Sequence, residues 1–126
     1  MTIALDVLPG VFAVCRLDAA AELPAAPAEP GGFWSLTRTA DEVSVICREE
    51  AIPDDAVVER GWRGLRVAGP LDFALTGVAA ALTAPLAEAG VSVLPVATFD
   101  TDYLFVREAS LPQAVAALAA AGHTVQ

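Results

Sequence analysis

Two acidic side chains, Asp100 and Asp102, stand where they could bind a positively charged group. They flank a short connection between two strand-like segments, and carboxylates recognise ammonium and guanidinium groups through charge-assisted hydrogen bonds. The pair is also compatible with general acid–base chemistry or with part of a metal site. Neither a histidine nor a third acid lies near them in the sequence, which favours recognition of a cation over both. The alternative without a function is that both aspartates are solvated turn residues.

A second candidate position is the segment Gly-Pro-Leu-Asp-Phe at residues 69–73. Gly69-Pro70 is a turn signal, and the Asp72 carboxylate can cap a helix that begins at Phe73. Amide hydrogens exposed at the start of a helix attract anions such as the α-carboxylate of an amino acid. A cap carboxylate occupies those hydrogens, so Asp72 also has a purely structural interpretation.

Nucleophilic chemistry is not indicated by the cysteines or the histidine. Cys15 and Cys47 each lie in an apolar strand-like segment and form no C-x-x-C pair, which is typical of buried free thiols. A catalytic cysteine needs a histidine partner, and the single histidine, His123, follows a helix-ending glycine near the C-terminus. The sequence also lacks a nucleotide motif. We therefore expect no enzyme activity, no metal and no cofactor.

The first half of the chain is predicted to be almost entirely extended. Pro24, Pro27 and Pro30 are spaced by three, which excludes a regular helix and favours a polyproline-like link. Thr39 is predicted to cap a single helical turn that ends at Glu42. The expected strands cover residues 3–8, 11–17, 33–38 and 43–47, the first two joined as a hairpin at Pro9-Gly10.

The second half is predicted to place two helices between strands. Pro85 should kink the first helix and Gly90 should end it, whereas Ser110 and Gln113 form a capping box for the second. The order β-α-β-β-α-β is that of a ferredoxin-like α/β fold with both helices on one face of the sheet. The first helix has its apolar face at Leu71, Leu75, Val78, Leu82 and Leu86, and the expected strands cover residues 62–68, 91–97, 103–106 and 123–125.

Composition argues against several classes of partner. The formal net charge is −9, and all seven basic residues are arginine, so a nucleic acid would be repelled. We interpret Arg60, Arg63 and Arg66 as a solvated face in preference to an anion site. No apolar run reaches the roughly 20 residues that a membrane span needs. The start of the chain has no basic residue and carries Asp6 within its apolar run, so we expect a cytoplasmic protein without a secretory signal.

Three segments, at residues 33–47, 61–73 and 98–103, together carry a resemblance to a known family. They resemble the small bacterial tandem ACT-domain proteins, which are similar to the cytosolic arginine sensor and, more distantly, to the regulatory domains of aspartate kinases. The resemblance implies an ACT domain at residues 61–126 and a reduced, mostly β ACT-like half at residues 1–60. The Pro-rich stretch departs from a full ACT repeat, which has a helix there.

The resemblance implies regulation by small-molecule binding, usually of an amino acid, at an interface between ACT units of a homodimer. It carries no catalytic residue. The ligand contacts that it implies are Gly69, Pro70, Leu71, Asp72, Phe73, Thr98, Phe99 and Asp102, with Ser44 and Val45 as the opposite wall. Two alternatives stay open: a ligand-free interaction module that dimerises through its sheets, and a small enzyme that uses Asp100 and Asp102.

Overall fold

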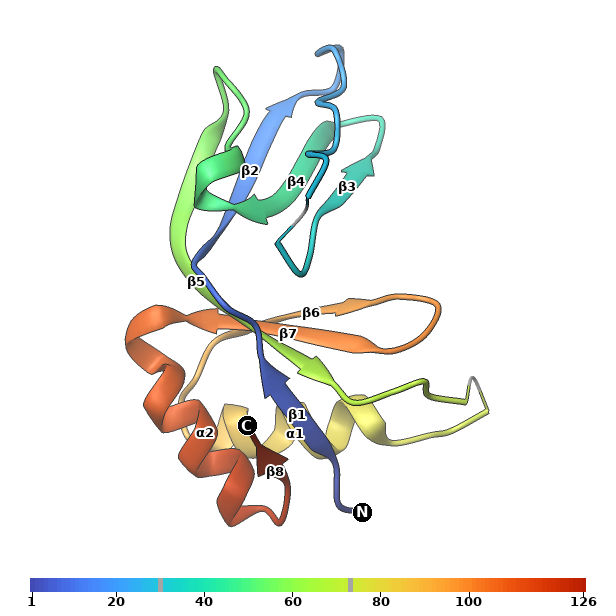
Figure 1. Ribbon diagram of the computed structural model, residues 1–126, viewed down its shortest axis with the longest axis vertical. Coiled ribbons are helices and arrows are strands. Elements are labelled where there is room, and N and C mark those ends of the chain that lie inside the picture. Colours follow the sequence, from blue (N-terminus) through green and yellow to red (C-terminus); the bar gives the residue numbers. More distant parts are fainter. Residues whose placement is uncertain (30, 73) are drawn as a thin grey trace. The chain divides into compact units, whose positions relative to one another are not determined.

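The chain folds as two compact units that share one long strand. The structure is a computed structural model that describes residues 1–29, 31–72 and 74–126. One unit, here the helical unit, combines Met1–Leu8 with Arg63–Gln126, and the other, the strand unit, is Pro9–Trp62. Strand β5 (Val57–Val67) contributes to both units (Figure 1). The chain therefore leaves the helical unit after eight residues and returns to it at Arg63.

The helical unit is a sheet covered by two helices, as the hydrophobic pattern predicted. Its described elements are β1 (Ala4–Val7), the end of β5, α1 (Val78–Glu88), β6 (Val93–Ala97), β7 (Asp102–Arg107), a short 3₁₀ turn (Glu108–Ser110), α2 (Leu111–Ala120) and β8 (Thr124–Val125). The strand order is β6-β7-β5-β1-β8, with β1 antiparallel to β5 and parallel to β8. From β5 onward the order β-α-β-β-α-β confirms the expected mixed α/β fold.

Strand β1 differs from its prediction, because it does not form a hairpin with the segment that follows it. Its partners among the described strands are β5 and β8, and it lies between them in the sheet. The backbone of β1 bonds to both neighbours: Ala68 N donates to Ala4 O at 2.8 Å, and Gln126 N donates to Leu5 O at 2.9 Å. The turn predicted at Pro9-Gly10 is wrong as well: β1 and β2 both run antiparallel to β5, so the chain bends there without reversing.

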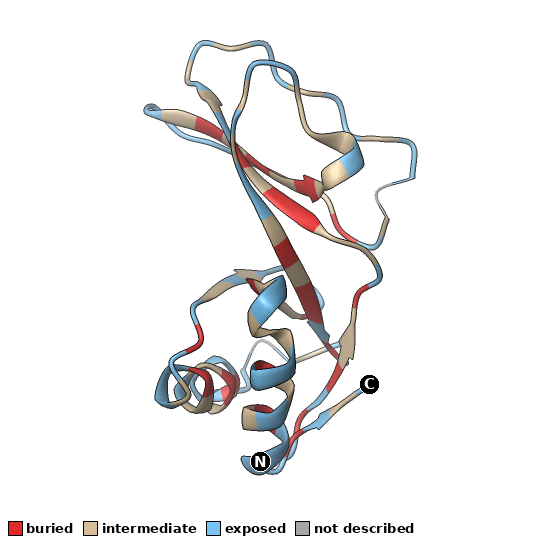
Figure 2. Cartoon of the chain, turned by 90° about the vertical axis from the view of Figure 1, so that its left-hand side faces the viewer, coloured by how far each residue is buried: buried red, intermediate tan, exposed pale blue. Residues whose placement is uncertain are grey.

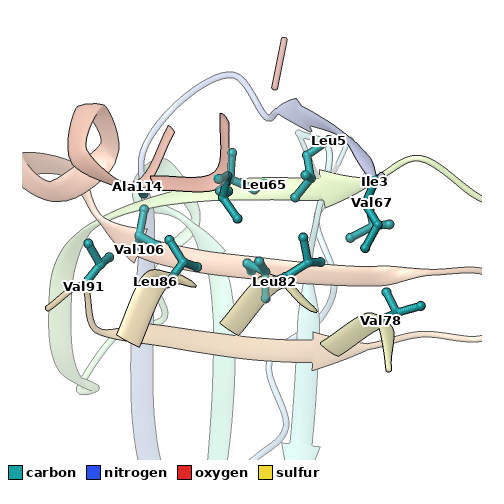
Figure 3. Packing of buried hydrophobic residues seen from close by; sticks show 12 residues of the cluster. Ile3, Leu5, Leu65, Val67, Val78, Leu82, Leu86, Val91, Val106 and Ala114 are labelled. Carbon is teal, nitrogen blue, oxygen red and sulfur yellow. The ribbon is translucent and has the colours of Figure 1, made fainter. Parts of the chain in front are cut away.

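The core of the helical unit lies between the helices and the sheet (Figure 3). Both helices are buried on one face and exposed on the other, which is how an amphipathic helix packs (Figure 2). Fully burying one leucine side chain in a core of this kind stabilises the folded state by about 1.5–3 kcal/mol. The fully buried members include Leu5, Leu65, Val67, Leu82, Leu86, Val106, Ala114 and Leu118.

The start of α1 was predicted wrongly, whereas α2 does begin after Ser110 but without the predicted capping bonds. Helix α1 begins at Val78 after Gly77, whose φ of 81° is left-handed, and no side chain caps it. Asp72 instead accepts a hydrogen bond from Ala74 N at 2.8 Å, within a turn that precedes the helix. Ser110 makes no cap bond, and the Gln113 side chain donates to Ala89 O at 2.6 Å, at the C-terminal end of α1. In both cases the polar side chain forms a hydrogen bond with a backbone group other than the one predicted.

The buried side chain of His123 supplies a hydrogen-bond donor that Pro85 cannot provide within α1. A residue at position 85 would normally donate its amide hydrogen to the carbonyl of Ala81, but proline has no such hydrogen. The Nε2 atom of His123 lies 3.1 Å from Ala81 O. Its Nδ1 accepts from Ile3 N at 3.1 Å, so the proton of the neutral ring belongs on Nε2. One histidine thereby connects β1, α1 and the start of β8.

The strand unit is an antiparallel sheet. It contains β2 (Phe12–Asp18), β3 (Ser35–Arg38), β4 (Glu42–Arg48), a 3₁₀ turn (Glu49–Ala51) and the start of β5, in the order β3-β4-β2-β5. Its core consists of Ala13, Cys15, Val43, Val45 and Cys47. The predicted helical turn at Thr39 is wrong, because its hydroxyl accepts from Asp41 N and Glu42 N inside the β3–β4 hairpin. Residues 19–29 form neither helix nor strand, as predicted.

A β-bulge interrupts the pairing of β2 with β5 in the strand unit. The register shifts between Phe12 and Val14, and Gly61 has a left-handed φ of 78°. The Gly61 amide donates to the Glu49 carboxylate at 3.0 Å, so a side chain satisfies this backbone donor. Glycine suits this position because it adopts the left-handed region without steric cost.

Candidate functional site

The turn at residues 69–72 and the β6–β7 connection at residues 98–102 meet in the helical unit. Leu71 N donates to Asp100 O at 2.7 Å, and the buried Thr101 hydroxyl donates to Val67 O at 2.6 Å. We call this meeting point the crossing. A Cβ atom on Gly69 would lie 3.0 Å from Thr101 Cβ and 3.1 Å from Asp100 O. Glycine therefore allows the closeness of the two segments.

The connection also holds its own shape through threonine hydrogen bonds. Thr98 N and the Thr98 hydroxyl both donate to Thr101 O at 2.9 Å. Thr101 N donates in turn to the Thr98 hydroxyl at 3.3 Å. The side chains of Asp100 and Asp102 take no part in this turn, so their carboxylates are left for other partners.

A hollow of about 170 Å³ lies on the helix-covered side of the crossing, and we call it the helix-face hollow. Three acidic residues line it, Asp72, Asp100 and Asp102, and no arginine is among its described lining residues. Phe99 at its rim is 80% exposed and Leu75 is 49% exposed. The remaining lining residues are Leu71, Val78, Ala97, Thr98 and Thr101.

A second hollow, of about 290 Å³, lies on the other side of the crossing, and we call it the strand-face hollow. Successive side chains of a strand point to opposite faces. Leu65 and Leu104 belong to the core under the helices, so Arg66 and Tyr103 point to the opposite face. The strand-face hollow is lined by Arg66, Gly69, Pro70, Thr98, Asp100, Thr101 and Tyr103.

The crossing therefore divides the implied ligand contacts between two hollows. Leu71, Asp72, Phe99 and Asp102 line the helix-face hollow, Gly69 and Pro70 line the strand-face hollow, and Thr98 lines both. Phe73 lies outside the described residues.

The two remaining implied contacts lie on β4 of the strand unit. Ser44 is half-buried there, whereas the Val45 side chain is fully buried in that unit's own core. Strand β4 is also paired on both edges, with β3 and with β2, so no surface of Val45 is exposed within the chain.

Sequence reasoning missed two residues that line the strand-face hollow, Arg66 and Tyr103. Arg66 was interpreted as part of a solvated face, and Tyr103 as a strand residue. The alternation of strand side chains was the signal that could have found both, since each lies next to a core leucine or valine in sequence and close to the crossing.

The charged groups at the crossing are largely uncommitted. Asp72 accepts the bond from Ala74, but within the described part of the chain no hydrogen bond or ion pair holds the side chains of Asp100, Asp102 or Arg66. The described residues also contain no group of three or more acidic, histidine or cysteine side chains arranged to hold a metal ion.

The two cysteines belong to the strand unit, whereas the crossing belongs to the helical unit. Both are free and buried, as predicted. Burial raises the pKa of the Cys15 thiol, and burial together with the adjacent Cys15 raises the pKa of Cys47 to about 12. Both thiols are therefore protonated at neutral pH, which is the unreactive form.

No helix in the described part of the chain combines the length and the apolar character that crossing a membrane requires.

Comparison with known proteins agrees with this fold. A family model described as the ACT domain matches residues 57–120, and a second model, described as an N-terminal domain, matches residues 10–55. The protein named cytosolic arginine sensor for mTORC1 subunit 1 from Bos taurus is 36% identical over 98 residues, 69% of this chain. The Homo sapiens protein of that name is 35% identical over 98 residues. The chain spans only about 30% of the length of either relative.

Solved structures give the same picture. A crystal structure of an Agrobacterium tumefaciens protein superposes with a TM-score of 0.90 at 39% identity, covering 100% of this chain and 93% of that one. Aspartate kinase from Clostridium acetobutylicum superposes with a TM-score of 0.67 at 14% identity, over 96% of this chain and 35% of that one, a likeness of fold alone. With the ACT-domain match spanning half of its length, this chain belongs to the ACT-domain family.

Proposed function

We propose that this protein is a regulatory ACT-domain protein that binds a basic amino acid at the helix-face hollow. Its family membership and its similarity to an arginine sensor support a ligand-binding regulatory role. The observation that carries the choice of ligand is the set of three aspartates around one small hollow, two of them without a bonding partner among the described residues. Carboxylates grouped in this way attract an ammonium or guanidinium group.

The surroundings of Asp102 fit a ligand with an aliphatic stem behind its positive charge. Asp102 lines both the helix-face hollow and a neighbouring apolar hollow of about 240 Å³. That neighbour is lined otherwise by Ala79, Leu82, Pro95, Val96, Ala97 and Leu104. Arginine and lysine combine an apolar stem with a cationic end, which matches this pair of hollows. Because the relatives are named arginine sensors, arginine is the first ligand to test.

The proposal extends to assembly and regulation. Since the chain spans about 30% of the arginine sensors' length, we propose that a homodimer supplies the further ACT units that a complete site needs. Ser44 and Val45 of β4 would then be the opposite wall, and Phe73 a further contact. Residues 1–60 would act as a reduced ACT-like half beside an ACT domain at 61–126. The protein would work in the cytoplasm, without catalysis, by shifting its population toward one dimer or partner-bound state.

The test is a thermal-shift screen of the purified protein against the twenty amino acids, agmatine and putrescine. A ligand at about a hundred times its dissociation constant stabilises the native state by about 2.7 kcal/mol, which raises the melting temperature by several degrees. We expect arginine or lysine to give the largest shift. Asp102→Asn should abolish it, whereas Asp54→Asn, the same charge change at an exposed position of the strand unit, should preserve it.

A flat screen, or equal losses in the two variants, would contradict the proposal. A flat screen combined with a dimer in light scattering would favour the alternative of a ligand-free interaction module.

A further inference from the structure

The strand unit carries an open groove that the proposed function does not use. It has a volume of about 560 Å³ and is lined by residues 21–25, in the link after β2, and by residues 53–55, in the turn before β5. Leu17 also lines it and packs against the core of the strand unit, so the groove reaches that core. Ligand sites commonly enclose about 300–1,000 Å³, so the groove is large enough for a short stretch of another chain.

The wall formed by the link is extended, because prolines prevent a helix there. Proline fixes its own φ near −65° and drives the preceding residue into an extended conformation, which applies to Pro24 and Pro27 and to Leu23 and Ala26 before them. Residues 22–27 accordingly form neither helix, strand nor turn (Figure 1). Both prolines are half-buried, whereas Leu23 is 45% exposed and lines the groove. An extended wall thus presents an apolar side chain to solvent.

The backbone of this wall is unpaired. Within the described part of the chain, the amide and carbonyl groups of residues 22–27 form no hydrogen bond. The link bond that precedes them runs from Ala21 N to Asp18 O, at 3.0 Å. Unpaired backbone groups of an extended segment can bond to a second extended chain, as when a peptide adds to the edge of a sheet. The wall therefore favours an extended peptide over a helix or a compact small molecule.

Acidic side chains stand on both walls of the groove. Glu22 on the link and Asp55 on the turn are exposed, and neither forms an ion pair or a hydrogen bond through its side chain in the described part of the chain. No basic residue is among the described residues that line the groove. Arg16, next to Leu17 in sequence, donates to Asp41 O at 3.1 Å. An apolar groove with an acidic rim complements a partner with basic and apolar side chains.

We propose that this groove is a docking site for an extended peptide segment of another protein, in which basic and apolar side chains alternate. Side chains of an extended chain alternate in direction, so the apolar ones enter the groove toward Leu17 and Leu23. The basic ones keep their charged ends in water and reach Glu22 and Asp55 with their flexible stems. The groove belongs to the strand unit, so the inference does not depend on the ligand proposed for the helix-face hollow.

The experiment measures binding to the full chain of a fluorescently labelled eight-residue peptide of alternating lysine and valine, by fluorescence anisotropy. We expect saturable binding that weakens at least fivefold between 20 and 200 mM salt, because salt screens the charges at the rim. A peptide with glutamate in place of lysine should not bind. Spermine, which carries charge without apolar side chains or a peptide backbone, should displace the labelled peptide at least tenfold less effectively than unlabelled peptide does.

A matched pair of double variants tests the acidic rim. Glu22→Gln with Asp55→Asn should weaken peptide binding at least fivefold. Asparagine suits position 55, where φ is +62°, because its short polar side chain tolerates the left-handed region. Asp41→Asn with Glu88→Gln removes the same charge at exposed positions outside the groove, and it should change the affinity less than twofold.

A second matched pair tests the apolar contact. Leu23→Thr should weaken binding at least fivefold, whereas Val57→Thr, at a position of β5 that is 71% exposed and lies outside the groove, should not. Methylating every second amide nitrogen of the peptide should weaken binding for one of the two possible alternations, because only one set of amides faces the link. The melting temperature of each variant establishes that it is folded.

Four results would overturn the inference. They are no binding of the lysine–valine peptide at 1 mM, equal binding of the glutamate peptide, displacement by spermine as effective as that by unlabelled peptide, and equal effects of a groove variant and its control. Binding that is insensitive to methylation in both alternations would equally contradict pairing with the extended link.

Discussion

The bond between His123 and the carbonyl of Ala81 makes a quantitative prediction about a proline inside a helix. Replacing His123 by phenylalanine leaves two backbone groups without partners. Ile3 N is buried, and leaving a buried donor unpaired costs about 1–3 kcal/mol. Ala81 O is half-buried, so its loss should cost about 1 kcal/mol. We therefore expect His123→Phe to lower the free energy of unfolding by about 2–4 kcal/mol.

The second substitution, Pro85→Ala, identifies the reason for that cost. An alanine at position 85 provides an amide hydrogen for Ala81 O, so the carbonyl no longer depends on His123. In this background His123→Phe should cost about 1 kcal/mol less than in the native sequence, which is a coupling energy of about 1 kcal/mol. The bond to Ile3 N is lost in both backgrounds and drops out of the difference.

The assay is urea unfolding of the four proteins of this double-mutant cycle, followed by circular dichroism. Pro112→Ala is the matched control, because Pro112 lies in the first turn of α2, where amide hydrogens have no partner within the helix. Its effect should add to that of His123→Phe with no coupling. A cost of His123→Phe below 1 kcal/mol, or an equal cost with proline and with alanine at position 85, would refute the reasoning.

Two further predictions concern the strand unit. Because the pKa of Cys47 is raised from 9.0 to about 12 in the folded protein, the stability linked to its neutral thiol is complete below pH 9 and is lost as the pH rises toward 12. The free energy of unfolding, measured with urea, should be lower at pH 10.5 than at pH 8, and Cys47→Ala should reduce this difference. An equal difference in the native protein and in Cys47→Ala would contradict the raised pKa of Cys47. Gly61→Ala should cost about 1–2 kcal/mol, because its φ is +78° while no atom lies within 4 Å of an added Cβ. A neutral result for Gly61→Ala in the same assay would mean that the bulge rearranges.

The parts of the fold that could be predicted are those where one residue pattern has one physical solution. Val78, Leu82 and Leu86 recur at helical spacing, and they form the buried face of α1. Val43, Val45 and Cys47 alternate, and they form the buried face of β4. Such patterns depend only on local backbone geometry and on burial, and the spacing of apolar residues in the sequence indicates both directly.

The parts that failed depend on competition between partners. Strand β1 could pair with the segment that follows it or with the end of β5, and the sequence does not rank the two. Asp72 and Gln113 could each cap a helix, but other backbone groups lay within reach. The outcome of these choices is decided by contacts between residues far apart in the chain.

The candidate site shows the same division. Its two segments, 69–72 and 98–102, were named through the family resemblance, and the structure brings them side by side. The division of the implied contacts between two hollows was not predicted. It depends on the backbone hydrogen bond from Leu71 N to Asp100 O, which cannot be inferred from residue types. Arg66 was overlooked because it was interpreted as part of a solvated face, although the alternation of side chains around Leu65 and Val67 could have placed it on the sheet face away from the helices.

The most direct test of the account is an NMR titration of the ¹⁵N-labelled protein with the basic amino acid that gives the larger shift in melting temperature. The account predicts saturable shifts at the amides of Leu71, Asp72 and residues 98–102, which surround the helix-face hollow, and their absence in Asp102→Asn. Saturable shifts confined to other parts of the chain, or no shifts at 10 mM ligand, would contradict the claim that this crossing is the regulatory ligand site.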